Sequence, residues 1–106
     1  MGIWAELVVR GQVISHADPS GGTFTAAGDF DRLLPVSGTS SGVLARVDPY
    51  GDAIVPGGDM AALASEVALL LTQAKQGRER RGLLRLQAVA LAGQAEPDAV
   101  LRFSGD

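Results

Sequence analysis

The chain has 106 residues, no cysteine, a single histidine and a formal net charge of −3. A chain of this length is expected to form one domain (1–106), which can bury a hydrophobic core without disulfides. The lack of thiols excludes disulfides, thiolate catalysis and cysteine-based zinc sites. The mild acidity argues against a nucleic-acid partner, because such a partner usually requires a broad basic face.

The apolar segments are short. None approaches the ~20 residues that a membrane-spanning helix needs, so no membrane partner is expected. The first six residues (Met-Gly-Ile-Trp-Ala-Glu) lack the basic region followed by an apolar region that marks a secretion signal. The expected location is therefore cytoplasmic.

The chain begins with a predicted strand. Residues 3–10 alternate strictly between two faces, which is typical of a half-buried strand. The apolar face carries Ile3, Ala5, Leu7 and Val9, and the other face carries Trp4, Glu6, Val8 and Arg10. Gly11 interrupts the alternation. Residues 12–16 are either a second strand or the same strand continued past a bulge.

Two later segments share one turn signature. Residues 18–21 (Asp-Pro-Ser-Gly) and 48–51 (Asp-Pro-Tyr-Gly) place Asp first, Pro second and Gly fourth, as a type I turn prefers. Each turn lies between two segments with strand character, and the pattern therefore predicts two β-hairpins. The flanking segments are 13–17 and 23–25 for the first turn, and 43–47 and 53–55 for the second.

The region between the two hairpins carries weaker signals. Residues 29–35 predict one helical turn before Pro35, with Phe30, Leu33 and Leu34 facing the core. Residues 37–42 (Ser-Gly-Thr-Ser-Ser-Gly) have no apolar anchor and are expected to form the most flexible stretch.

Residues 59–92 predict a pair of helices. Asp59 is the expected N-cap, since its carboxylate can accept free backbone N–H groups. Apolar residues recur at helical spacing up to residue 74, and Gly77 is the expected stop. A second helix is expected from about Arg78 to Ala92, ended by Gly93. Because only Gly77 would separate the helices, they should form a tight antiparallel αα-hairpin or one kinked helix.

The last strand completes the predicted fold. Ala99, Leu101 and Phe103 alternate with Val100 and Arg102. The order of elements predicts an α+β domain. It should contain an antiparallel sheet of about four to six strands, made of the two hairpins and the N- and C-terminal strands. The αα-hairpin should pack on one face of this sheet.

Few residues offer catalytic chemistry. His16 alone cannot supply a His-rich metal site, and no Gly-x-Ser-x-Gly elbow or phosphate-binding glycine loop is present. We expect His16 to be a solvated residue beside the first turn. No catalytic residue, metal ligand or cofactor is predicted. Arg78, Arg81 and Arg85 would share one helix face, which we interpret as solvated; docking of a phosphate or an acidic protein surface is the alternative.

Two segments carry a family resemblance. Residues 47–52 (Val-Asp-Pro-Tyr-Gly-Asp) and 101–106 (Leu-Arg-Phe-Ser-Gly-Asp) flank the helix pair. The chain thereby resembles a set of small uncharacterised bacterial proteins with a mid-chain Asp-Pro-Tyr-Gly-Asp segment and a C-terminal Phe-x-Gly-Asp. Those proteins have a fuller aromatic pattern in the last strand. The resemblance covers residues 47–106 and implies no catalytic residues. It implies that one feature contains Asp48, Tyr50, Asp52, Gly105 and Asp106.

These observations favour a non-catalytic protein-interaction module. An immunity-type protein that neutralises a toxin partner is the most concrete version, because such proteins are often small, acidic and free of catalytic groups. The alternative is a small metal-binding or enzymatic domain that uses an Asp48/Asp52/Asp106 carboxylate cluster. A homodimer with a structural role is a third possibility. The candidate partner-binding residues are Trp4, Asp48, Tyr50, Asp52 and Asp106.

Overall fold

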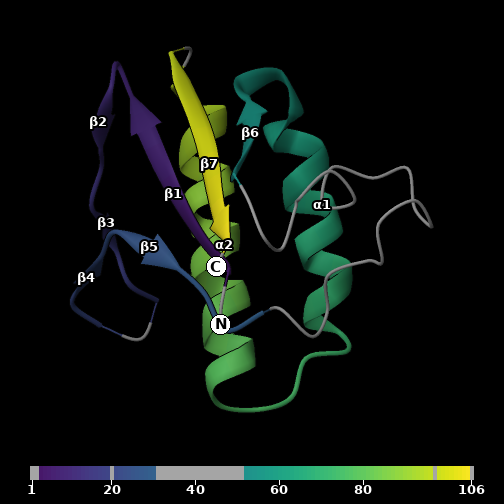
Figure 1. Ribbon diagram of the computed structural model, residues 1–106. Coiled ribbons are helices and arrows are strands. Elements are labelled where there is room, and N and C mark those ends of the chain that lie inside the picture. Colours follow the sequence, from purple (N-terminus) through teal and green to yellow (C-terminus); the bar gives the residue numbers. More distant parts are fainter. Residues whose placement is uncertain (1–2, 20, 31–51, 97, 106) are drawn as a thin grey trace.

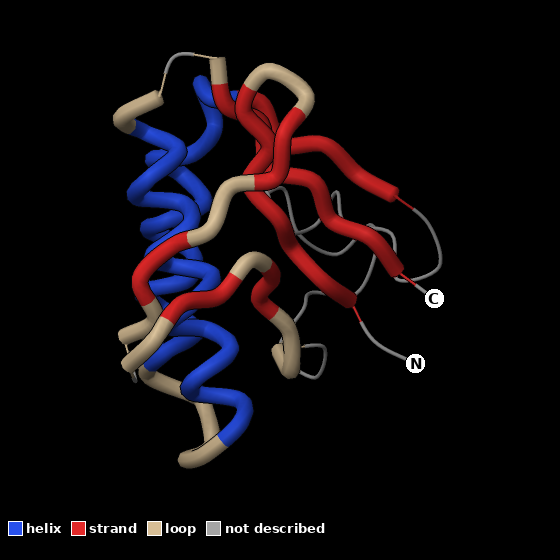
Figure 2. The backbone as a smooth tube through the Cα atoms, turned by 90° about the vertical axis from the view of Figure 1, so that its left-hand side faces the viewer, coloured by secondary structure: helices blue, strands red, loops and turns tan. Residues whose placement is uncertain are grey.

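The sheet and the helices form two layers. The computed structural model describes residues 3–19, 21–30, 52–96 and 98–105. In these ranges a five-stranded antiparallel sheet lies on one side and two helices lie on the other, beside a smaller two-stranded sheet (Figure 1, Figure 2). The predicted α+β fold with a helix pair on one face of an antiparallel sheet is confirmed.

The two central strands come from the two ends of the chain. β1 (Ile3–Val9) and β7 (Ala99–Gly105) pair antiparallel along their whole length, from Ile3 opposite Gly105 to Val9 opposite Ala99. Every second residue of both strands points to the helices, and these apolar side chains are buried, as the alternation predicts. They are Ile3, Ala5 and Leu7 in β1, and Ala99, Leu101 and Phe103 in β7.

Short strands flank this central pair. β6 (Asp52–Pro56) pairs with the other edge of β7. The other edge of β1 pairs with β2 (Gln12–Val13) at one end and with β5 (Ala26–Ala27) further along. Both run antiparallel to β1, so β2 and β5 act as one strand that is interrupted by an inserted hairpin. That hairpin is the small sheet of β3 (His16–Ala17) and β4 (Thr23–Phe24).

The β3–β4 hairpin is the first of the two predicted hairpins. Its turn is confirmed, since the Gly21 amide donates a hydrogen bond to the Asp18 carbonyl at 2.9 Å. For the second predicted hairpin, the later strand is present as β6, which pairs with β7. Its Asp48 turn and the preceding segment 43–47 lie outside the described residues. The predicted helical turn at 29–35 and the loop at 37–42 also fall largely outside them, although Phe30 is described and buried.

A two-residue turn joins β1 to β2. Arg10 and Gly11 both have positive φ, at 53° and 81°, and Val9 pairs with Gln12 across them. Two consecutive residues with positive φ define a type I′ hairpin turn, whose twist matches that of the strands. Residues 12–16 therefore begin with a second strand, and the alternative of one strand continued past a bulge is wrong.

The helix pair is an αα-hairpin with a longer connection than predicted. A 3₁₀ turn (Gly57–Asp59) leads into α1 (Met60–Leu71), and α2 spans Arg78–Gln94. The alternative of one kinked helix is wrong. The expected stop at Gly77 is also wrong, because α1 ends at Leu71 and residues 72–77 form the connection. Here the Thr72 hydroxyl donates to the Leu69 carbonyl at 2.6 Å, which competes with continued helix.

Two expected helix ends differ from the structure. Asp59 occupies the N-cap position of α1, yet its side chain makes no capping hydrogen bond. Its backbone is helical (φ −100°, ψ 0°) because the 3₁₀ turn precedes it, and capping requires an extended residue. Gly93 does not end α2. It lies inside the helix, where a Cβ would approach the Met60 side chain to 2.9 Å.

The core lies between α2 and the central strands. Buried residues of α2, which include Leu83, Leu86 and Val89, share one hydrophobic cluster with Leu101 and Phe103 of β7. Phe30 meets Phe103 edge to face, with ring centroids 6.3 Å apart. Of the helices that the structure describes, none is long and apolar enough to cross a bilayer.

Candidate functional site

The outer face of the sheet is the side turned away from both helices (Figure 2). The strand register arranges its side chains in rows across β1, β7 and β6. The first row is Trp4–Ser104–Asp52, the second is Glu6–Arg102–Ile54, and the third is Val8–Val100–Pro56. Because side chains on facing residues of adjacent strands are neighbours, each row is a continuous line of contacts.

Large apolar side chains are exposed on this outer face. Trp4 is 49% exposed, Ile54 is 54% exposed, and Val13, which pairs with Val8 at the edge, is 41% exposed. Trp4 is nevertheless held in place by backbone. A Cβ on Gly28 would lie only 2.9 Å from the Trp4 ring, so the indole rests directly on this glycine. The outer face thus presents a fixed aromatic ring to solvent.

An ion pair occupies the centre of the same face. Arg102 Nη2 of β7 donates to Glu6 Oε1 of β1 at 3.3 Å. Arg102 Nε is buried and has no hydrogen-bond partner in the described part of the chain. The Arg102 side chain is partly exposed between Glu6 and Ile54, and its charge is balanced within the face by Glu6.

The structure brings two of the five predicted site residues together. Trp4 and Asp52 face the same residue, Ser104, from opposite sides and lie in one row at one end of the outer face. Asp48, Tyr50 and Asp106 lie outside the described residues. The resemblance drawn from the Asp-Pro-Tyr-Gly-Asp segment therefore stays a prediction.

The alternative carboxylate cluster has one described member. Asp52 is exposed at the start of β6, where it pairs with Ser104 of β7, and Asp48 and Asp106 lie outside the described residues. No group of three or more His, Asp or Glu side chains that could hold a metal ion occurs within the described ranges. The metal-binding alternative thus stays a prediction, because two of its three carboxylates lie outside those ranges.

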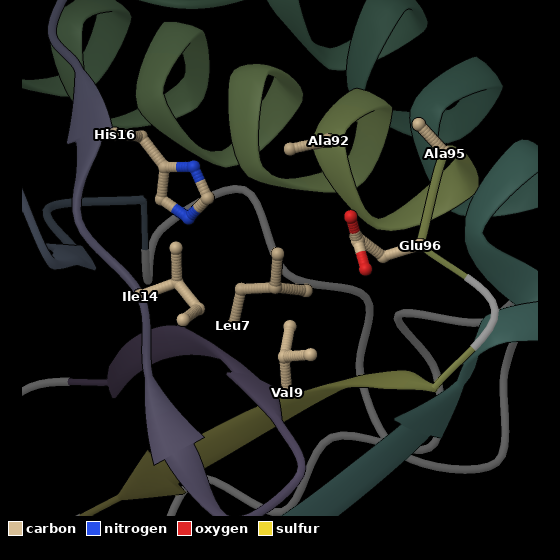
Figure 3. A pocket seen from close by; sticks show the side chains of 7 residues that line it. All are labelled: Leu7, Val9, Ile14, His16, Ala92, Ala95 and Glu96. Carbon is tan, nitrogen blue, oxygen red and sulfur yellow. The ribbon is translucent and has the colours of Figure 1, made fainter.

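A pocket opens on the opposite, helix-facing side of the sheet. It has a volume of about 400 Å³ and lies between the β1–β3 segment and the C-terminal end of α2 (Figure 3). Its lining is mostly aliphatic, with two polar side chains. These residues are Leu7, Val9, Ile14, His16, Ala92, Ala95 and Glu96.

His16 is one of the polar groups of this pocket, and the prediction of a solvated side chain is wrong. The residue is only partly exposed, and its Nε2 atom is buried without a hydrogen-bond partner among the described residues. Its ring lies 5.8 Å from that of Phe24, its partner in the β3–β4 hairpin. This burial lowers the pKa of His16 below the usual 6.5 because it disfavours the charged imidazolium.

The predicted solvated arginine face also needs correction. Arg85 donates from Nε to the Asp18 carboxylate at 2.8 Å, and its guanidinium lies 5.6 Å from the centre of the Phe24 ring. Asp18 is buried, so this pair fixes the β3–β4 hairpin to α2. Arg80 contacts the Leu71 carbonyl at 3.4 Å across the helix connection. Arg78 and Arg81 are exposed, as expected.

Sequence reasoning could not have found the pocket. Its residues come from β1, from β3 and the segment before it, and from the end of α2, and they meet only because α2 crosses the sheet at this point. Comparison with protein-family models, with curated proteins and with solved structures finds no match.

Proposed function

We propose that this chain is a non-catalytic protein-interaction module that binds a protein partner through the outer face of its sheet. The observation that carries the proposal is the exposed Trp4 ring, held on Gly28 in one row with Asp52. Tryptophan is among the residues that most often dominate binding energy at protein interfaces. A ring already fixed in the free protein loses little conformational freedom on binding.

The surroundings of Trp4 support the same role. Ile54 and Val13 extend the apolar surface to both sides of the β1–β7 pair, and Arg102 and Glu6 supply a paired polar centre. Apolar and aromatic side chains together with arginine are typical of an interface core. Asp52 and the net charge of −3 favour a partner with a basic surface, because complementary charge speeds association.

A capture experiment with matched variants tests this proposal. The full chain is immobilised and exposed to an extract of its source cell, and bound proteins are identified by mass spectrometry. The partner that the unmodified chain retains should be lost with Trp4→Ser and weakened with Ile54→Ser. Affinity measured with the purified partner should fall about 30-fold or more for Trp4→Ser, as for an interface hot spot.

The helices offer the matched controls. Leu69 and Leu91 are exposed apolar residues too, at 68% and 53%, but they lie on α1 and α2. Leu69→Ser and Leu91→Ser should leave binding unchanged. Loss of the partner with these variants and retention with Trp4→Ser would contradict the proposal. A melting curve for Trp4→Ser separates lost binding from lost folding, since the ring also contacts Gly28.

Two finer versions follow from the same proposal. The immunity version holds that the partner is a toxin in the cytoplasm and that its activity disappears in the complex; a retained toxin that stays fully active would contradict that version. Self-association is the competing outcome. If sedimentation shows a dimer that Trp4→Ser dissociates, the outer face joins two copies of this chain, and the proposed separate partner is wrong.

A further inference from the structure

The pocket beside His16 has walls suited to a hydrocarbon chain. Leu7 and Val9 of β1, together with Ile14, supply aliphatic side chains on one side, and Ala92 of α2 and Ala95 just after it supply small ones on the other. At about 400 Å³ its volume falls within the range of small-molecule sites. Sites of this kind combine apolar walls with a few polar groups that orient the ligand.

Two polar groups face this apolar space. Figure 3 shows the His16 ring and the Glu96 carboxylate entering the pocket from opposite sides. A carboxylate only accepts hydrogen bonds, and an uncharged imidazole accepts at one of its two nitrogens. No salt bridge joins Glu96 to another residue within the described ranges. The pocket therefore offers two hydrogen-bond acceptors to a ligand.

The end of α2 adds negative potential to the same place. Ala92, Ala95 and Glu96 belong to its last turn and to the residues that follow, and no basic residue lies in that turn. The carbonyl groups at a helix C-terminus carry a partial negative charge, and here those of Ala92 and Gly93 also accept the Ala95 and Glu96 amides at 3.2 Å. None of the described lining residues is a lysine or an arginine, so a ligand anion would meet no countercharge.

We propose that this pocket binds a small aliphatic amine in its protonated form. The hydrocarbon chain would lie between Leu7, Val9 and Ile14. The ammonium group would donate to the exposed Glu96 carboxylate, in a hydrogen bond strengthened by its charge. Because the pocket is on the helix-facing side, this binding is separate from the interaction proposed for the outer face, and either could occur without the other.

A titration with three ligands of equal chain length tests the proposal. Hexylamine, 1-hexanol and hexanoate are added to the ¹⁵N-labelled full chain at pH 7.5, and amide and imidazole shifts are followed by NMR. Hexylamine should bind with a dissociation constant of about 1 mM or lower, which requires only a modest binding free energy per non-hydrogen atom of the ligand. Hexanol should bind more weakly, and hexanoate should not bind measurably. The shifts should centre on His16, Ile14 and Glu96.

Variants then locate the charge recognition. Glu96→Gln should weaken hexylamine about tenfold, as expected for the loss of one charged hydrogen bond, and leave hexanol unchanged. Glu66→Gln makes the same change on α1, away from the pocket lining, and should alter neither ligand. Ala92→Leu should fill the pocket and abolish binding of both; Ala95→Leu serves the same purpose if the first variant does not fold.

Three results would overturn the proposal. The first is that none of the three ligands produces shifts at the pocket. The second is that hexanoate binds as tightly as hexylamine, because charge would then play no part. The third is that Glu96→Gln leaves the affinity for hexylamine unchanged, which would assign the ammonium group to another place.

Discussion

The two faces of the β1–β7 pair consist of alternate residues of the same strands, yet they differ in exposure. The side chains that point to the helices are at most 3% exposed. They are Ile3, Ala5 and Leu7 of β1, and Ala99, Leu101 and Phe103 of β7. On the outer face, Trp4 and Ile54 are about half exposed. Helix packing therefore makes the inner face responsible for stability, and it leaves the outer face free to change with little cost to folding.

The largest expected difference between the faces comes from removing one side chain on each. Phe103→Ala should destabilise the protein by about 3–5 kcal/mol, because it leaves a cavity at a fully buried ring. Ile54→Ala on the outer face should cost less than about 1 kcal/mol. Urea unfolding measures both. Similar losses for the two variants would mean that the outer face also takes part in the folded core.

A second test adds atoms where the helix layer meets the sheet layer. A Cβ at Gly82 of α2 would overlap the backbone carbonyl oxygen of Gly28, just beyond β5. Gly82→Ala should therefore push α2 from the sheet and cost about 2–3 kcal/mol, despite the better helix propensity of alanine.

The control for this test is Gly58 in the 3₁₀ turn, where a Cβ would have no atom within 4 Å. Gly58→Ala should be neutral or slightly stabilising. Thermal melting distinguishes the two variants. An unchanged melting temperature for Gly82→Ala would show that the contact between α2 and Gly28 is not as close as the structure places it.

Ion pairs give a smaller contrast. The Asp18 side chain is 3% exposed and pairs with Arg85 between the β3–β4 hairpin and α2, whereas the Arg10–Asp98 pair is largely exposed at the end of the sheet. Asp18→Asn should cost about 2 kcal/mol, because it leaves the Arg85 charge without its buried partner. Asp98→Asn should cost at most about 0.5 kcal/mol. Equal effects in urea unfolding would contradict a structural role for the Asp18 pair.

These contrasts also show what the sequence could predict. The two faces of β1 and β7 were predictable, because period-2 alternation is a local property of each strand. The start of α2 and the apolar sides of both helices followed from helical spacing in the same way. The end of α1 did not, since residues 72–76 contain nothing that forbids a helix. The connection there is held by Arg80 and by Glu79, which accepts the Lys75 amide at 2.9 Å.

The candidate sites depend on contacts between distant residues. Asp18 and Arg85 are 67 positions apart, and no local pattern joins them. The row of Trp4 and Asp52 requires the register of three strands, and the pocket requires α2 to cross β1 at one place. The Arg10–Gly11 turn differs, because two residues between strands are a local hairpin signal. The sequence left a second strand and a bulge as alternatives there, because arginine rarely adopts positive φ.

The smallest expected effect is a pH dependence that arises on the inner side of the sheet. Burial lowers the pKa of His16, so the unfolded chain binds a proton more readily than the folded chain. Above pH 6.5 both states are uncharged at this residue and the stability does not depend on it. As the pH falls below 6.5, the unfolded state is protonated first and the folded state loses stability, until the folded pKa is passed.

His16→Gln removes this contribution, so the difference in unfolding free energy between pH 7.5 and pH 5.0 should be smaller in the variant than in the unmodified chain. An equal difference in both proteins would show that the His16 ring is as well solvated in the folded chain as in the unfolded chain.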